Sequence, residues 1–232
     1  MNVVDALVWE LMKQLNCETV FTIPVLSGIP ISESIVVTWI IMAVVIVCCQ
    51  IFVRNLRVES PGPRQLALES AVSGIYHFFQ DVMGGYGKEY IPYLMAVTIY
   101  IGIANLISIF GFKPPTKDLN VTIALAVMSI VLIEIAGVRQ RGVKGWLKGF
   151  AEPMIVVLPI NILEVFIKPL SLCMRLFGNV LGSFVIMELI KAVIPVFVPA
   201  VFSCYFDIFD GLIQAYVFVF LTALFIKEAT EE

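Results

Sequence analysis

The chain has 232 residues, of which 60% are apolar and only 14% are charged. Soluble domains average about 45–50% apolar and about 25% charged residues, so this composition excludes a large soluble domain and predicts an integral membrane protein. The net charge of −3 comes without any gathered basic patch, so nucleic acid is not an expected partner.

An acidic segment, 1–34, begins the chain with four acids and one base, so it lacks the positive start of a cleaved signal peptide. We expect it to be a short external tail. The apolar runs that follow predict membrane helices, because none of them alternates polar and apolar residues as a membrane strand does. Five transmembrane helices are predicted, at 35–53, 91–110, 121–138, 153–190 and 200–226.

The segment 54–90, between the first two helices, is amphipathic. After the breaker Pro61-Gly62-Pro63, apolar and small residues recur at steps of three and four among charged neighbours. This period predicts a helix that lies in the membrane interface. The predicted fold class is therefore all-α integral membrane: one domain, 1–232, with five spans and one interfacial amphipathic helix.

The loop lysines and arginines predict the orientation. The side that carries 54–90, 139–152 and the C-terminus holds nine of them, and the opposite side holds four. Because cytoplasmic loops are enriched in Lys and Arg, the first side is expected to be cytoplasmic. The N-terminus then lies outside and the C-terminus inside.

The fourth predicted helix is too long to stand upright. Its roughly 38 residues would extend about 57 Å at about 1.5 Å per residue, whereas the hydrocarbon core is about 30 Å thick. Strong tilt or a broken, partly in-plane path follows. We expect the last two helices to form a long, strongly tilted antiparallel hairpin that turns near Pro195.

Each helix of this hairpin carries one narrow polar stripe. At about 100° per residue, the two stripes lie within about 40° of Arg175 and of Gln214. Counting from the turn places these two residues at one depth. The first stripe comprises Asn161, Glu164, Lys168, Ser171, Arg175 and Asn179, and the second comprises Ser203, Asp207, Asp210 and Gln214.

A guanidinium at mid-membrane costs roughly 2.5–3.5 kcal/mol on insertion scales, so Arg175 needs an anionic partner or a water-filled cavity. It does not release its proton, but it can separate two polar half-paths and attract a carboxylate from another chain. Gly178 and Gly182 beside it permit close approach of another backbone. These features indicate an ion-translocating stator.

Polar groups lie on both sides of the Arg175 level. Glu164 and Asn161 belong to the inside half, and three acids belong to the outside half. Glu188 falls about 140° from the stripe, so it is expected to face the interior of the subunit. With Asp207 and Asp210 it is expected to line an enclosed access path.

Simpler roles remain open for these residues. Arg175 could pair with an acid of the same chain, and Glu164 could pair with Lys168 one turn later. The other polar groups could be ordinary interhelical hydrogen-bond partners, or near-surface acids paired with Lys191.

Two other functions remain open for the protein as a whole. The main alternative is a secondary transporter whose Arg175 binds an anionic substrate, although no internal repeat supports it. A membrane scaffold is a third possibility.

Motifs for catalysis or metal binding are absent from the sequence. Four of the five cysteines lie in apolar runs and none has CxxC spacing. The single histidine belongs to no HExxH pattern, and neither GxSxG nor a P-loop occurs. We expect a non-catalytic chain with no cofactor and no metal.

The run KPLSLCMRLFGN at 168–179 resembles the signature of subunit a of the F-type ATP synthase, bacterial type. LPIN at 158–161, DLNVT at 118–122 and QAYVF at 214–218 resemble further parts of that family. The resemblance implies a stator that couples H⁺ or Na⁺ flow to ATP synthesis through two offset half-channels. The implied partners are a ring of small subunits with ion-binding carboxylates, the peripheral stalk subunit b and, indirectly, the catalytic ATPase head. The implied location is the bacterial inner membrane.

The resemblance also implies roles for individual residues. Arg175 matches the arginine that faces each ring carboxylate in turn, and Asn179 and Gln214 match its polar neighbours. Two acids differ from some relatives: the fourth-helix acid is Glu188, and Asp207 stands where some relatives have histidine. Three further residues resemble the outer access region of the family: Asn105, Asp118 and Asn120.

Overall fold

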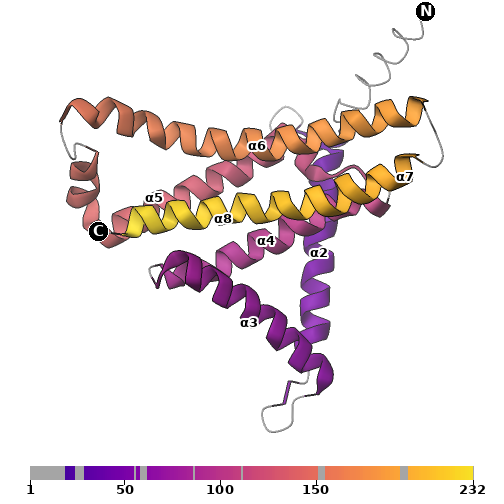
Figure 1. Cartoon of the computed structure of the whole chain (residues 1–232), viewed down its shortest axis with the longest axis horizontal. Coiled ribbons are helices and arrows are strands. Elements are labelled where there is room, and N and C mark those ends of the chain that lie inside the picture. Colours follow the sequence, from indigo (N-terminus) through magenta and orange to yellow (C-terminus); the bar gives the residue numbers. More distant parts are fainter. Residues whose placement is uncertain are drawn as a thin grey trace, which may run out of the picture.

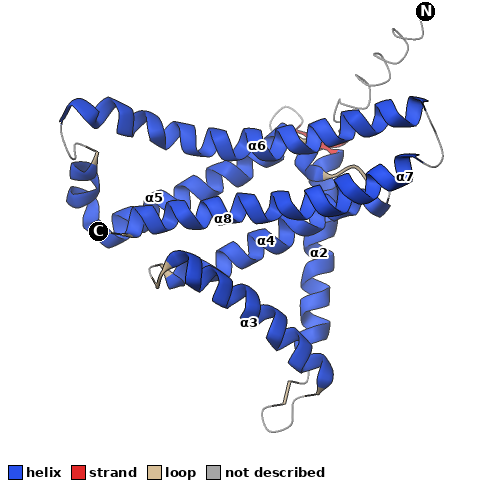
Figure 2. Ribbon diagram, in the orientation of Figure 1, coloured by secondary structure: helices blue, strands red, loops and turns tan. Residues whose placement is uncertain are grey.

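The computed structural model describes residues 19–23, 29–54, 56–57, 62–85, 87–110, 112–150, 155–193 and 198–231. Figure 2 shows that helices make up almost all of this part of the chain. Five of the described helices are long and apolar enough to cross a membrane. The prediction of an all-α integral membrane protein with five spans is confirmed.

The helices are joined by short turns, several of which are single 3-10 turns. Their order is the predicted one: the amphipathic helix, α3, follows the first span, and the other four spans come after it. The α-helices are α2 (Glu33–Val53), α3 (Pro63–Met83), α4 (Ile91–Leu106), α5 (Leu119–Gly149), α6 (Leu158–Val193), α7 (Val198–Ser203) and α8 (Gly211–Thr230). The short elements are the 3-10 helices η1 (Lys88–Tyr90), η2 (Ile107–Phe110), η3 (Pro115–Lys117) and η4 (Ile155–Val157), and the π-helix η5 (Cys204–Asp210).

A small β-hairpin lies in the segment that was expected to be an external tail. Strands β1 (Thr19–Ile23) and β2 (Ile29–Ser32) pair antiparallel just before α2. The Ser32 hydroxyl donates a hydrogen bond to Asp118, and Glu33 forms a 2.9 Å ion pair with Lys113. The start of α2 is thereby tied to the segment before α5. Residues 1–18 and 24–28 of this tail lie outside the described residues.

Helix α5 continues beyond the predicted end of the third span at 138. It breaks at Gly142, whose φ of 71° is readily adopted only by glycine. A short helical arm follows, and the Trp146 indole donates a 2.8 Å hydrogen bond to Glu134 before the break. The stretch 139–152, counted as a loop in the sequence, is thus helical as far as Gly149.

Helices α6 and α8 run side by side and antiparallel along the longest axis of the molecule (Figure 1). α6 has 36 residues with Pro169 inside it, and α7, η5 and α8 follow one another as a single rod. In Figure 1 α2 crosses this pair steeply, so an upright α2 leaves the pair strongly tilted. The predicted antiparallel pairing of these last long helices is confirmed, and their strong tilt in the membrane stays a prediction. The turn of the hairpin, at 194–197, lies outside the described residues.

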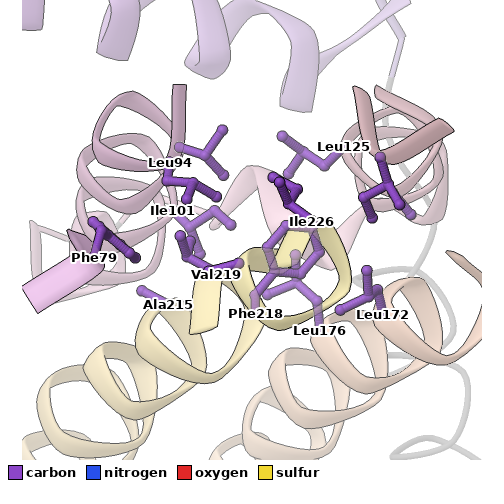
Figure 3. Packing of buried hydrophobic residues seen from close by; sticks show 14 of the residues in the cluster. Phe79, Leu94, Ile101, Leu125, Leu172, Leu176, Ala215, Phe218, Val219 and Ile226 are labelled. Carbon is purple, nitrogen blue, oxygen red and sulfur yellow. The ribbon is translucent and has the colours of Figure 1, made fainter. Parts of the chain in front are cut away.

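The buried core lies where α8 meets α3, α4, α5 and α6 (Figure 3). Phe218 of α8 is near its centre and Leu176 of α6 packs from one side. The α6 residues buried in this core are Leu172, Cys173 and Leu176. Because these three share one helix face, neighbouring positions such as Arg175 are turned away from the core.

Replacing Phe218 with alanine should loosen this junction. Phe218 is 1% exposed, so truncation leaves a cavity and should cost about 3–5 kcal/mol. We expect a clearly lower thermal unfolding midpoint for Phe218→Ala in detergent, and little change for Phe110→Ala, whose native side chain is 78% exposed. Equal midpoints for the two variants would contradict this packing.

Candidate functional site

Arg175 lies near the middle of α6 on a face turned away from the core. It is exposed, and none of the described residues forms a hydrogen bond or ion pair with it. The alternative in which Arg175 pairs with an acid of the same chain therefore finds no support in the described structure. The guanidinium is available to a group outside this chain.

The surface beside Arg175 is open. A Cβ atom added at Gly178 or at Gly182 would meet nothing within 4 Å. Ser171, one turn before the arginine, is also exposed and lines neither of the cavities described below. This face of α6 can accept another helix at close range.

Asn179 and Gln214 join α6 to α8. The Asn179 amide donates a hydrogen bond to Gln214 Oε1, so the residue opposite Gln214 is Asn179, one turn after Arg175. Counting from the turn had placed Gln214 opposite Arg175. The count assumed α-helical rise throughout, whereas η5 is a π-helix of seven residues, which holds more residues per turn.

Gln214 is only 3% exposed, and its side-chain nitrogen, Nε2, has no hydrogen-bond partner among the described residues. A buried amide donor without a partner is costly. Gln214 is also one of the residues that line the cavity described next.

A cavity of about 540 Å³ lies between α6, η5, the start of α8 and the end of α4, toward the turn of the hairpin. We name it the turn-side cavity. The structure brings together here the outside-half residues predicted from the two stripes. Its polar lining comprises Asn105, Ser108, Lys113, Ser183, Glu188, Lys191, Ser203, Asp207, Asp210 and Gln214.

Serine hydroxyls bind the two aspartates of this cavity. Asp207 accepts hydrogen bonds from Ser108, at 2.9 Å, and from Ser203. Asp210 accepts one from Ser183 at 3.2 Å. No ion pair to either aspartate is found in the part of the chain that the structure describes.

Glu188 differs from the aspartates because it pairs with Lys191 at 2.9 Å. Its side chain is turned inward from the Arg175 face and lines the turn-side cavity, as the angular count predicts. Glu188 therefore does have the simpler role of an ion-pair partner of Lys191. Lining the cavity and pairing with Lys191 occur together.

Asn105 forms the wall of the turn-side cavity on the α4 side. Its amide donates to the Gly211 carbonyl at 2.9 Å and accepts from the Thr116 hydroxyl at 2.8 Å. A Cβ at Gly211 would lie 3.0 Å from the Asn105 Cβ, so glycine permits this close approach of α4 and α8. Asn105 thus connects three elements around the cavity.

Asp118 and Asn120 lie apart from this cavity. Asp118 is buried and caps α5 by accepting a 3.0 Å hydrogen bond from the backbone N–H of Asn120, while Asn120 itself is exposed. Their geometry is that of a helix start tied to Ser32. The structure does not place them with the other predicted access residues.

A second cavity, of about 230 Å³, lies near the C-terminus between α5, α6 and α8. We name it the tail-side cavity. It contains Asn161 and Glu164, the two residues predicted for the inside half. Lys168 forms ion pairs there with Glu164 at 3.3 Å and with Glu228 at 3.2 Å. The simpler role of Glu164, pairing with Lys168 one turn later, is therefore present, and the pair has a third member.

Sequence reasoning missed Glu228 as a cavity residue, together with Glu134 and Arg141. The stripe on the fifth helix contained a usable signal. Glu228 lies 14 residues after Gln214, which at about 100° per residue returns it to within about 40° of the stripe. Glu134 and Arg141 lie seven residues apart on one face of α5, before the break at Gly142, and this spacing is itself a sign of a shared polar face.

The two cavities share no lining residue among those described. Arg175 lies between them along α6: Lys168 is about 10 Å before it and Ser183 about 12 Å after it, at about 1.5 Å per residue. Two separate polar cavities thus flank one outward-facing cation.

Comparisons with known proteins show which family the chain resembles. The sequence profile of the family described as "ATP synthase A chain" matches residues 35–227. ATP synthase subunit a 2 of Bradyrhizobium sp. is 35% identical over 205 residues, covering 88% of this chain and 91% of the relative.

Two further relatives have similar coverage. ATP synthase subunit a of Moorella thermoacetica is 35% identical over 202 residues, 87% of this chain and 92% of the relative. A protein of Propionigenium modestum named "ATP synthase subunit a, sodium ion specific" is 32% identical over 216 residues, 86% of this chain and 74% of that protein.

Thiol labelling can test whether the cavities hold water and open on opposite faces. In a chain whose native cysteines are replaced, Ser183→Cys in the turn-side cavity and Asn161→Cys in the tail-side cavity should react with a charged maleimide, because thiolate formation requires water. We expect labelling of the two from opposite sides of the membrane. Ser129→Cys is the control and should stay unlabelled, since Ser129 is fully buried.

Proposed function

This chain belongs to the ATP synthase A chain family, and from that membership we propose that it is the ion-translocating stator of a rotary F-type ATP synthase. In this proposal the two cavities are offset half-channels. Arg175 separates them, and ion flow through them is coupled to ATP synthesis. The chain itself carries no ATP chemistry and acts as a membrane component of the complex.

The observation that carries the proposal is the position of Arg175, exposed and without a partner in the described chain, midway between two polar cavities. A fixed positive charge raises the electrostatic energy of a cation that passes straight from one cavity to the other. The same charge attracts a carboxylate presented on the open face of α6. An ion is therefore directed onto a mobile carboxylate instead of leaking past.

Each cavity then serves one step of transfer. An ion that enters one cavity moves to a carboxylate of a neighbouring ring at the α6 face, and after rotation it leaves through the other cavity. Gly178 and Gly182 support close approach of ring helices, because the surface above them is open. Asn179 and Gln214 lie where the turn-side cavity comes nearest to Arg175.

The proposal covers H⁺ and Na⁺ alike, because the ion-binding carboxylate belongs to the ring. The Propionigenium modestum relative is named as sodium ion specific, whereas the Bradyrhizobium and Moorella relatives carry no ion in their names. Further proposed partners are the peripheral stalk subunit b and, indirectly, the catalytic head. Since its relatives are ATP synthase subunits, the stator is favoured over a secondary transporter.

The protein is a multi-pass protein of the bacterial plasma membrane. We propose that its N-terminus lies outside and its C-terminus in the cytoplasm, because the loops on the C-terminal side hold nine of the lysines and arginines. In this orientation the turn-side cavity opens outward and the tail-side cavity opens to the cytoplasm.

Replacing Arg175 with alanine should abolish ATP-driven ion uptake into inverted membrane vesicles, because the two paths lose their separating charge. Arg175→Lys should restore uptake only in part, since a compact ammonium does not reproduce the planar guanidinium. ATP hydrolysis and assembly of the complex are recorded in parallel.

Arg139→Ala is the matched control. Arg139 is a membrane-edge arginine whose side chain is 68% exposed and paired with Glu89, so uptake should stay at the wild-type level. An assembled Arg175→Ala complex that pumps like wild type would overturn the proposal.

The orientation predicts which ends of the chain a protease can reach. An epitope tag after residue 232 should be cleaved in inverted vesicles and protected in intact spheroplasts, and a tag before residue 1 should behave in the opposite way. Cleavage of both tags from one face would contradict an odd number of crossings.

A further inference from the structure

We propose that Glu228 collects protons at the mouth of the tail-side cavity and exchanges them with Glu164 across Lys168. The inference rests on the proposed function and adds two statements to it. It gives a role to a residue at the end of α8, and it names H⁺ as the ion that uses this mouth.

The three side chains form one connected group between α6 and the last turn of α8. Lys168 Nζ lies 3.3 Å from Glu164 Oε1 and 3.2 Å from Glu228 Oε2. The side chain of Lys168 is only 18% exposed, whereas those of Glu164 and Glu228 are 47% and 59% exposed. The ammonium is thus enclosed, and Glu228 is the member that most fully meets water.

Two neighbouring contacts hold this group in place. Arg141 donates hydrogen bonds to the backbone carbonyls of Glu228 and Glu231, which fixes the final turn of α8 against α5 just before its break. The Lys168 ammonium lies 5.2 Å from the ring centroid of Phe225, one turn before Glu228. Glu228 is therefore anchored at the rim of the cavity instead of moving freely in water.

Lys168 allows two carboxylates to share one small site. Without it their mutual repulsion would drive them apart. When a proton binds one carboxylate, that carboxylate becomes neutral and the ammonium pairs with the other. A new O–H bond forms as the O–H or N–H bond of the donor acid breaks, and no other group is transferred.

The central ammonium also distinguishes between the possible ions. A sodium ion at this position would keep its charge and would lie beside Lys168, where the repulsion between two cations is strong. A proton on Glu164 or Glu228 neutralises a carboxylate and leaves no second free cation next to the ammonium. The group therefore suits H⁺.

A carboxylate at a channel mouth raises the local supply of protons. At neutral pH free protons are scarce, so surface acids that take them from buffer can limit the rate of uptake. Focusing of charge at a cavity mouth changes local concentrations by about 10- to 1,000-fold. Loss of Glu228 should therefore slow proton supply, and a mobile buffer should replace it.

The test uses the intact complex in inverted vesicles, whose cytoplasmic face points outward. ATP-driven pumping then draws protons from the outer medium through the tail-side cavity into the lumen. In dilute buffer, Glu228→Gln should lower the initial rate of lumen acidification about tenfold. High concentrations of imidazole in the outer medium should restore the rate to near wild type. Glu231→Gln is the matched control, because it removes the same charge one turn later from a residue outside the cavity lining.

A second variant separates proton collection from a structural role. Glu228→Asp keeps an acid at the rim, so this variant should pump protons in dilute buffer without added imidazole. It also provides the test of the inference if Glu228→Gln fails to assemble. Wild-type pumping by Glu228→Gln in dilute buffer would overturn the inference. A loss that imidazole does not relieve in an assembled complex would overturn it as well.

The results for the Glu228 variants and for Arg175→Ala test the two proposals independently. A wild-type complex that pumps Na⁺ and no H⁺ would overturn the role of Glu228 and leave the stator proposal standing. If Arg175→Ala pumps normally, the stator proposal fails whatever Glu228 does.

Discussion

A permanent positive charge halfway along a membrane helix is the constraint on which the rest of this structure depends. Arg175 cannot lose its proton, and lipid alone does not solvate it. α6 meets this constraint by leaving the arginine exposed while Leu172 and Leu176, on the adjacent face of the helix, are buried in the core. The described chain supplies no acid for it. The structure therefore leaves an unpaired cation on an open face, which is what the proposed ring carboxylate needs.

The rod formed by α7, η5 and α8 supports this arrangement from the other side of the hairpin. Its buried residues, with Phe218 at the centre, hold four other helices together. Its polar residues serve the two cavities, Gln214 in the turn-side cavity and Glu228 in the tail-side cavity. The π-helix between Cys204 and Asp210 places both aspartates and Ser203 toward one cavity, and π-helical segments frequently occur at functional sites.

Charges are distributed differently at the mouths of the cavities and deeper within them. Ion pairs with lysine occur toward the ends of the hairpin, as in Glu188 with Lys191 and in Glu228 with Lys168. Asp207 and Asp210 instead accept hydrogen bonds from neutral serines. A carboxylate bound to a hydroxyl can exchange an ion without leaving a lysine unpaired. In the turn-side part of the proposed path, the Glu188–Lys191 pair therefore lies toward the mouth, and the hydroxyl-bound Asp210 lies closer to Arg175.

The sequence by itself determined the five spans, because lipid requires unbroken apolar runs, and it determined the outward face of Arg175, because helical periodicity is local. It also predicted the Glu164–Lys168 pair and the acids of the turn-side cavity. Only the tertiary structure decided that Asn179 lies opposite Gln214, that Asp118 binds Ser32 and that Glu228 joins Lys168. The first of these relations depends on the π-helix, and all three depend on which surfaces meet. Hydropathy and angular spacing within one helix carry no information about contacts between elements.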